Sequence, residues 1–393
     1  MRRVCTALLA VVAILVLAAC GSTGTSAGPD VPTAGATSPS GTTSSATGTT
    51  TTPVTPQPLR PGERRVTVRV PTAYTPSAPT GVGTDDYRCF LLDPKVTKDS
   101  FVTGFNVLPG NPDVVHHVIL FRVPPDLVAE AERKDAATPG EGWTCFGTSG
   151  LSNDGSIDDA PWLGAWAPGG TDQVYGNGLG ERFDAGSRVI MQVHYNLLAG
   201  TAPDRSAAEL RLSSDPHTKA LETQLLPAPV ELPCRPGHTG DLCDRDKALA
   251  DVKARFGDGP GSTANNLHLL CGGGPPGPVQ SCTREVTGPE TIRGVAGHMH
   301  LLGKSIRVEV DPGTPKARTL LDIPVWDFDN QRSVPTPPLH LDRGDTIKVT
   351  CTHSQDLRDK LPAFQTQRQD RYVMWGEGTT DEMCLAILLV TRP

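Results

Sequence analysis

Short segments in which apolar and polar residues alternate are the main pattern along this chain. Residues 65–70 read RVTVRV and residues 305–310 read SIRVEV, so each segment places apolar side chains at every second position. Because successive side chains of a β-strand point to opposite faces, both segments predict strands with one buried face. More continuous apolar runs at residues 115–123, 189–198 and 384–391 predict central strands that are covered on both faces.

Helical patterns are few. Residues 125–134 and 244–256 predict helices, while residues 204–214 predict the last strand of the first half. The 41 Gly and 37 Pro, with only 5% aromatic residues, favour short elements joined by turns over a helical bundle. The chain is therefore predicted to be all-β. Its folded part, about 330 residues, exceeds what one core usually serves, so we expect domains at 64–215 and 216–393.

The first 63 residues predict a targeting segment and a stalk. Residues 1–19 carry Arg2, Arg3 and an apolar run, and a small-residue site follows that ends at Cys20. This order resembles a bacterial lipoprotein signal peptide with Cys20 as the lipidated residue; an ordinary secretory signal is the alternative. Residues 20–63 are rich in Ser, Thr and Pro and predict a disordered linker. We expect an exported protein, anchored by lipid to the outer face of the bacterial cytoplasmic membrane.

Cysteine usage fits an exported protein. Besides Cys5 and Cys20, the chain has eight cysteines, an even number that predicts disulfides outside the cytosol. These are Cys89, Cys145, Cys234, Cys243, Cys271, Cys282, Cys351 and Cys384. The four from Cys234 to Cys282 allow three pairings and fall in residues 231–288, which we expect to be an insertion. The formal net charge of −7 and the lack of a basic run give no support for nucleic-acid binding.

Five histidines and one methionine provide the candidate chemistry. They are His116, His117, His194, His298, His300 and Met383. Imidazole and thioether groups bind copper in both of its oxidation states. In a strand, residues i and i+2 share a face, so His298 and His300 can face one ion. Neighbours such as His116 and His117 point apart, and they can share a metal only where the strand ends, twists or bulges.

In this order, these segments resemble the copper type II, ascorbate-dependent monooxygenases, the family of peptidylglycine alpha-hydroxylating and dopamine beta-monooxygenases. The resemblance spans about residues 64–393. It rests on YRCF at 87–90, VHHV at 115–118, QVHYN at 192–196, GHMHLLGK at 297–304 and TDEMC at 380–384.

The resemblance implies two antiparallel, jelly-roll-like β-sandwich domains with a copper site in each. The electron-transfer copper would be held by His116, His117 and His194. The oxygen-binding, catalytic copper would be held by His298, His300 and Met383. The same resemblance implies the disulfides Cys89–Cys145 and Cys351–Cys384.

The activity implied is hydroxylation of a C–H bond of a small organic substrate with dioxygen. The expected cofactors are two copper ions per chain and an external reductant, ascorbate or a bacterial substitute. Peptide-amidating members hold the peptide carboxylate with an Arg and an Asn, where this chain has Ala296 and Leu385. Peptide amidation is therefore not expected, because neither side chain can bind a carboxylate.

Other functions use part of the same pattern. A copper-binding or storage lipoprotein would use these ligands without catalysis, a zinc hydrolase would use only the His-x-His strand, and an adhesion sandwich would use none of them. The remaining histidines match no ligand of the family and are expected on the surface or in loops. They are His217, His238, His268, His340 and His353.

Overall fold

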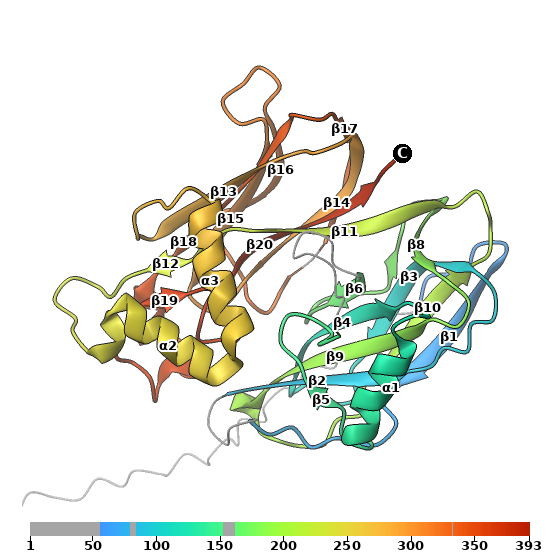
Figure 1. Ribbon diagram of the computed structural model, residues 1–393, viewed down its shortest axis with the longest axis horizontal. Helices are drawn as coiled ribbons and strands as arrows, with labels where there is room; N and C mark the ends of the chain where they lie inside the picture. Colours follow the sequence, from blue (N-terminus) through green and yellow to red (C-terminus); the bar gives the residue numbers. More distant parts are fainter. Residues whose placement is uncertain (1–55, 79–83, 152–161, 332) are drawn as a thin grey trace, which may run out of the picture. The chain divides into compact units, whose positions relative to one another are not determined.

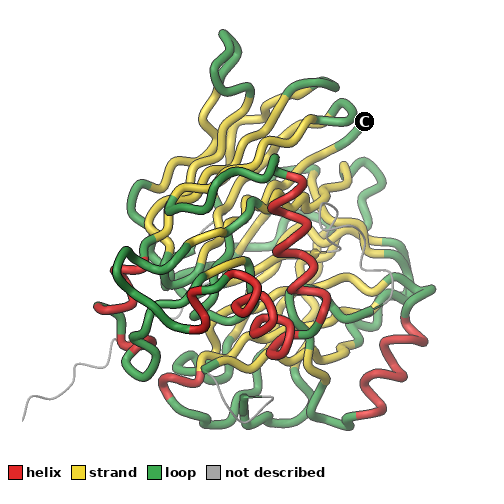
Figure 2. Tube along the Cα trace, turned by 60° about the vertical axis from the view of Figure 1, so that its left-hand side comes forward, coloured by secondary structure: helices red, strands yellow, loops and turns green. Residues whose placement is uncertain are grey.

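Strands outnumber helices in the computed structural model, which describes residues 56–78, 84–151, 162–331 and 333–393. The expected signal peptide, Cys20 and most of the expected linker lie outside these residues. Figure 2 shows the helices on the outside of the strands. The prediction of a mainly β protein with antiparallel sheets is confirmed. Within the described ranges, no helix is both long and apolar enough to cross a membrane.

The first half contains a fully antiparallel sheet that carries three of the candidate ligands. Its strands, in spatial order, are β5 (Trp143–Thr144), β2 (Asp85–Leu92), β9 (Arg188–Asn196), β4 (Val115–Val123) and β6 (Trp162–Trp166). Helix α1 (Val128–Ala137) follows β4 in the sequence, and the short 3₁₀-helix η1 (Leu197–Ala199) follows β9.

A long sheet runs through both halves (Figure 1). Its order is β1 (Glu63–Arg69), β10 (Ala207–Ser213), β3 (Ser100–Leu108), β8 (Leu179–Phe183), β11 (Lys219–Pro227), β20 (Cys384–Thr391), β14 (Glu290–Met299) and β17 (Val334–Leu341), with β7 (Gln173–Val174) on β3. Strand β11 pairs parallel with β8 and antiparallel with β20. The boundary expected after residue 215 is thus bridged by a shared strand, and Pro53–Pro393 form one compact unit.

The second half adds an antiparallel sheet and most of the helices. The sheet contains β13 (Val279–Glu285), β18 (Thr346–His353), β15 (Gly303–Val310) and β16 (Arg318–Ile323). A small pair joins β12 (Glu231–Leu232) to β19 (Val373–Met374). The helices are α2 (Arg245–Phe256), α3 (Asp258–Leu270), and the 3₁₀-helices η2 (Asp241–Cys243), η3 (Gln355–Asp359) and η4 (Pro362–Phe364).

Three clusters of buried apolar residues hold these layers together. One lies mainly in the first half, where Leu120, Met191 and Leu210 come from β4, β9 and β10, and Leu221 of β11 joins it. A second lies within the second half. The third combines residues of both halves, including Ile119 and Met383, with residues of α2 and α3. Burial of apolar surface therefore joins the halves where the candidate ligands lie.

Several predicted elements have the predicted bounds. The strands at residues 115–123 and 384–391 are β4 and β20, and α2 begins one residue after predicted Asp244, whose side chain caps its N-terminus. The predicted helix at 125–134 begins later, at Val128, because its first residues form a turn.

The segment expected as an insertion, residues 231–288, is only partly separate from the sheets. Strand β13 lies within it and pairs along its whole length with β18. Helix α3 was not predicted, since its sequence DGPGSTANNLHLL contains two glycines and a proline. It is stabilised by packing, because Ala264 and Leu267 join the third cluster beside Ala248 and Val252 of α2.

All eight cysteines named above are paired. The two expected disulfides, Cys89–Cys145 and Cys351–Cys384, are confirmed. The four cysteines left open pair as Cys234–Cys243 and Cys271–Cys282. The disulfide at Cys384 fixes the start of β20, directly after Met383.

Candidate metal centre

A bulge in β4 brings His116 and His117 to the same place. The pairing of β4 with β9 shifts register between Val115 and His117, so that His116 is the additional residue. Ring nitrogen Nδ1 of His116 consequently lies 3.3 Å from Nδ1 of His117. The irregularity that an adjacent histidine pair requires is present.

His194 completes a group of three imidazoles. It pairs with His117 across the β4–β9 ladder, and its Nδ1 lies 3.2 Å from Nδ1 of His117. Three nitrogens about 2.0 Å from a tetrahedral metal are separated by roughly 3.3 Å, so the spacing suits a metal ion. Hydrogen bonding explains it less well, because Nδ1 of His117 has only one hydrogen or one lone pair to share between two neighbours.

The charge state of these rings also suits metal binding. Burial, together with the charges of neighbouring histidines, holds the pKa of His116 and the pKa of His117 well below the usual histidine range. Both rings are therefore neutral at physiological pH, which is the form that binds metals. Nε2 of His116 is buried and has no hydrogen-bond partner in the part of the chain that the structure describes.

Asp85 fixes the orientation of His194. Its Oδ1 lies 2.8 Å from Nε2 of His194 and also accepts a hydrogen bond of 2.9 Å from Thr379. Burial would raise the pKa of Asp85, but the hydrogen bond and charge of His194 lower it below its usual value. The carboxylate thus holds a proton on Nε2 and leaves the lone pair of Nδ1 directed toward His117.

Tyr87 supports the same ring from its face. The two rings are stacked with centroids 4.0 Å apart and planes 5° from parallel. The Tyr87 hydroxyl donates a 2.6 Å hydrogen bond to the backbone carbonyl of Glu377. Tyr87, like the Asp85–Thr379 pair, thereby links the His194 site to the second half of the chain.

The other three candidate ligands lie at the neighbouring ends of β14 and β20. His298 and His300 have ring centroids 5.2 Å apart, and both line the same cavity as Met383. His298 Nδ1 lies 2.6 Å from Oε1 of Gln331, which leaves Nε2 available. Burial and the nearby His300 lower the pKa of His298 to about 3. Nδ1 of His300 is also buried, and it has no hydrogen-bond partner among the described residues.

Glu382 connects these ends through its buried carboxylate. It accepts hydrogen bonds from the backbone N–H groups of His300 at 3.0 Å and Met383 at 3.2 Å, and also from that of Leu302. His353 lies beside it, with Nε2 3.4 Å from Oε2 of Glu382. His353 was expected on the surface or in a loop, but it is 1% exposed in β18, because it belongs to this buried polar group. His340 is exposed on β17, as expected, whereas His268 is partly buried on α3.

The two histidine sets are close together. The ring centroids of His117 and His298 are 5.9 Å apart. Phe328 stacks on His116 at 4.2 Å and meets the ring of His300 edge-on at 6.3 Å. Residues 326–331 therefore contact both sets, through Phe328 and through Gln331.

All six candidate ligands are thus placed in one region, but in unequal detail. Among the described residues, His116, His117 and His194 are the one group of three or more His, Cys, Asp or Glu side chains close enough to share a metal. His298, His300 and Met383 share a cavity wall. The supporting residues Asp85 and Thr379 were not recognised in the sequence, since no local motif marks them.

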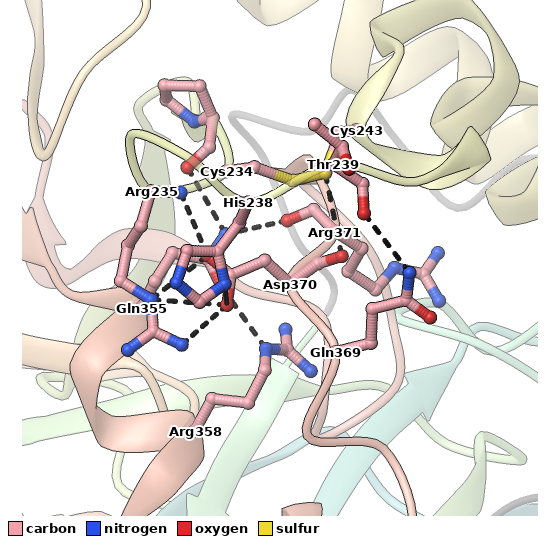
Figure 3. The surroundings of a disulfide bond; sticks show 11 residues. Cys234, Arg235, His238, Thr239, Cys243, Gln355, Arg358, Gln369, Asp370 and Arg371 are labelled. Carbon is pink, nitrogen blue, oxygen red and sulfur yellow. Dashed lines mark hydrogen bonds and ion pairs between the residues drawn. A yellow bond between two sulfur atoms is a disulfide. The ribbon is translucent and has the colours of Figure 1, made fainter.

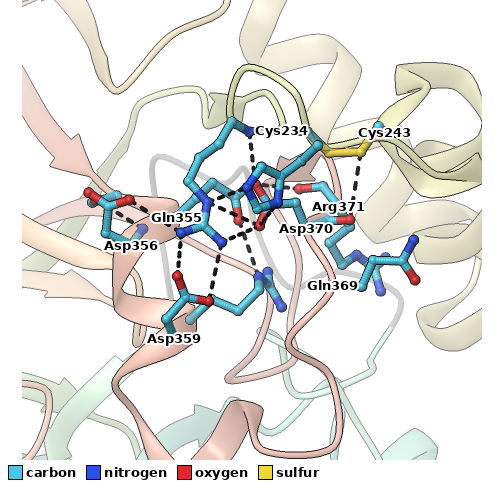
Figure 4. Close-up of polar contacts among 12 residues, drawn as sticks. Cys234, Cys243, Gln355, Asp356, Asp359, Gln369, Asp370 and Arg371 are labelled. Atoms are coloured by element: carbon cyan, nitrogen blue, oxygen red, sulfur yellow. Dashed lines mark hydrogen bonds and ion pairs between the residues drawn. A yellow bond between two sulfur atoms is a disulfide. The ribbon is translucent and has the colours of Figure 1, made fainter.

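The loop that carries Met383 is also held from outside. Arg255 of α2 forms two hydrogen bonds, of 2.6 and 2.7 Å, with the carboxylate of Asp381. Upstream of the loop, Asp370 accepts hydrogen bonds from the backbone and guanidinium of Arg235, which adjoins the Cys234–Cys243 disulfide (Figure 3). Arg235 also donates a 3.2 Å hydrogen bond to Asp359, and Figure 4 shows Asp359 and Asp370 in the same group of polar contacts. Residues 231–288 therefore hold the chain at two places before Met383, through Arg235 at Asp370 and through Arg255 at Asp381.

Comparisons with known proteins do not indicate a family. No protein-family model and no curated protein matches the chain. Among solved structures it is similar to a Paenibacillus xanthan lyase (12% identity, TM-score 0.19, 86% of this chain and 27% of the lyase). It is also similar to allantoicase (12% identity, TM-score 0.16, 68% of this chain and 73% of allantoicase). A third similar structure is procruciferin, an 11S globulin from Brassica napus (12% identity, TM-score 0.15, 79% of this chain and 77% of procruciferin). The chain spans about a quarter of the lyase, and such low TM-scores carry no argument about function.

Proposed function

We propose that this chain is a copper-dependent monooxygenase that hydroxylates a C–H bond of a small organic substrate. His116, His117 and His194 hold one copper, and His298, His300 and Met383 hold the other. The observation that carries the proposal is the convergence of three imidazole nitrogens, 3.2 and 3.3 Å apart, beside a second pair of histidines and a thioether. A His₃ group alone would suit zinc equally well. The thioether favours copper.

When bound, copper supplies one-electron redox chemistry with dioxygen. The overall reaction combines RH, O₂, two electrons and two protons to give ROH and water, so an external reductant, ascorbate or a bacterial substitute, is required. The chain's own residues keep His116 and His117 neutral by burial, orient His194 through Asp85, and line the adjoining cavity mainly with apolar side chains.

The fold is consistent with one ligand set in each of two β-sandwich domains, 64–215 and 216–393. Each half has its own apolar core, and the ligand sets lie where the third core joins the halves. The four disulfides support an oxidising compartment. We infer that the chain is exported and held at the cell envelope by a lipid on Cys20.

Copper K-edge X-ray absorption on the reduced, copper-loaded protein tests the proposal. We expect two coppers per chain and one sulfur ligand shared over the pair, and the sulfur signal should disappear in Met383→Ala. Met374→Ala is the matched control, because Met374 is also buried but does not line the cavity.

The remaining outcomes separate the alternatives. Two coppers without reductant-dependent oxygen consumption would indicate a storage protein. One metal per chain, with zinc preferred over copper, would indicate that only the three-histidine group binds metal, and the monooxygenase proposal would fail.

A further inference from the structure

One wall of the cavity beside Met383 follows from strand register. The β14–β20 pairing sets His298 opposite Leu385 and Ala296 opposite Ile387, and the β20–β11 pairing sets Ile387 opposite Leu225. All five residues line the cavity, which has a volume of about 410 Å³. Since alternate residues of a strand share a face, this side of the sheet is apolar except for the imidazole and the Thr223 hydroxyl.

The facing wall is aromatic. Trp162 and Trp166 of β6 and Phe105 of β3 line it, together with Tyr175. Gly164 lets these strands approach closely, because a Cβ atom there would lie 2.0 Å from the ring of Phe105. The cavity thus lies between β6 of the first half and the β11–β20–β14 part of the long sheet.

The polar ends of several lining side chains are already bonded to backbone carbonyls. Tyr175 donates its hydroxyl to Leu163 at 2.8 Å, and Trp166 donates its indole N–H to Gly170 at 3.1 Å. Gln192 donates to Thr148 at 3.1 Å, but its Oε1 is buried without a hydrogen-bond partner among the described residues. These side chains therefore present mainly their apolar surfaces to a ligand.

The described residues that line the cavity also carry little charge, which favours an uncharged ligand. Among the described residues that line the cavity there is no Lys, Arg or Asp. Glu377 is its one carboxylate, and burial, with a smaller effect from Asp381, raises the pKa of Glu377 to about 7. In the metal-free chain, a carboxylate in the ligand would lose its hydration without gaining a cationic side chain as a partner, which is costly in an apolar site.

The volume indicates the size of the ligand. An apolar cavity of about 150 Å³ holds one benzene molecule. A cavity of about 410 Å³ therefore has room for a molecule of two linked or fused rings.

We propose that this cavity binds an uncharged, apolar organic molecule of about two rings as the substrate, with the C–H bond to be hydroxylated placed beside Met383. The reaction named here rests on the proposed function. Binding itself depends only on the cavity, so it is measurable without metal.

Three probes of matched size test the proposal: 4-phenylbenzyl alcohol, 4-phenylbenzoate and 4-phenylbenzylammonium. Their dissociation constants are measured by isothermal titration calorimetry on the purified full-length chain without metal. The neutral alcohol is expected to bind at least tenfold more tightly than either ion. Equal or tighter binding of an ion, or no binding of the alcohol, would overturn the proposal.

Two variants locate the site. Leu225→Trp fills the cavity from β11 and should weaken binding of the alcohol at least tenfold, whereas Glu222→Trp, at an exposed position of the same strand, should not. Ala296→Arg supplies a cation and should strengthen binding of 4-phenylbenzoate at least tenfold over the unmodified chain. If neither variant changes binding while the fold is retained, the ligand binds elsewhere and the proposal is wrong.

Counting copper after loading the same preparations with copper separates the two proposals. Two coppers per chain without probe binding would reject the substrate class and leave the monooxygenase proposal intact. Tight binding of the alcohol by a chain that takes up no copper would support the ligand class and reject the monooxygenase proposal.

Discussion

At the scale of single residues, the carboxylate of Asp85 has the most specific role. Its hydrogen bond fixes the His194 tautomer in which Nδ1 is free to bind metal. We predict that Asp85→Asn, which keeps the shape but removes the charge, lowers the copper affinity of the three-histidine group by roughly 10- to 100-fold. Competition with a calibrated chelator measures this. Asp93→Asn, at an exposed carboxylate just after β2, should have no effect.

Glu377 gives a pH dependence whose sign is fixed by its burial. Its pKa is raised from 4.5 to about 7 on folding, so between these values the folded state binds more protons than the unfolded state. The free energy of unfolding therefore falls as pH rises through this window. We predict that Glu377→Gln removes this loss. The free energy of unfolding of the variant, relative to that of the unmodified chain, should therefore be about 3 kcal/mol higher at pH 8.5 than at pH 4.

Chemical denaturation of the metal-free protein at several pH values measures the Glu377 effect. Glu285→Gln, at an exposed position of β13, is the control and should follow the unmodified chain. A difference between Glu377→Gln and the unmodified chain that stays constant with pH would contradict the prediction.

The sequence identified the candidate ligands but not the residues that orient them. Histidine and methionine can be identified as candidate metal ligands from their residue type and from short spacings such as His-x-His. Asp85 lies 109 residues from His194, and Thr379 lies 294 residues from Asp85, so only the fold brings them together. His353 was expected on the surface or in a loop because it matches no ligand of the family, and its buried contact with Glu382 follows no local motif.

At the scale of secondary-structure elements, Glu382 holds the end of β14 to the start of β20. Removing its carboxylate leaves three buried backbone N–H groups without their acceptor. We predict that Glu382→Ala lowers the free energy of unfolding by at least about 3 kcal/mol, with Glu382→Gln in between.

Urea denaturation measures the Glu382 effect, with Glu309→Ala on β15 as the control at a less buried carboxylate. X-ray absorption adds a readout of positioning, because the Met383 sulfur signal should weaken in Glu382→Gln even where the fold is retained. An unchanged stability in Glu382→Ala would show that other groups or water satisfy these amides.

Elements were predictable where local pattern and tertiary packing agree. Strands β4 and β20 have uninterrupted apolar runs, and they form with the predicted bounds. Helix α3 does not follow its local sequence, because packing against α2 overrides the poor helix propensity of its glycines. The bulge at His116 was predictable only in part. Metal binding by an adjacent histidine pair requires an irregular strand, but the sequence around His116 contains no signal for a bulge.

At the scale of the whole molecule, the sequence indicated two halves with one ligand set each. It did not indicate that the halves share a sheet, because β11 is an ordinary apolar strand whose partners lie far apart in sequence. Its hydrogen bonds to β8 and β20 place the His117 and His298 rings in one fixed assembly, with centroids 5.9 Å apart.

The shared strand has a consequence for how the protein can be divided. If residues 64–215 were produced alone, β8 would lose its β11 partner, and if residues 216–393 were produced alone, β11 would keep β20 but present an unpaired edge. Unpaired edges promote self-association. We predict that each fragment aggregates when expressed separately and that co-expression restores soluble material, as size-exclusion chromatography would show. Neither ligand set, on this reasoning, is inherited as an independent module: a gene fusion or recombination event that exchanged one half would have to supply a compatible β11 edge as well.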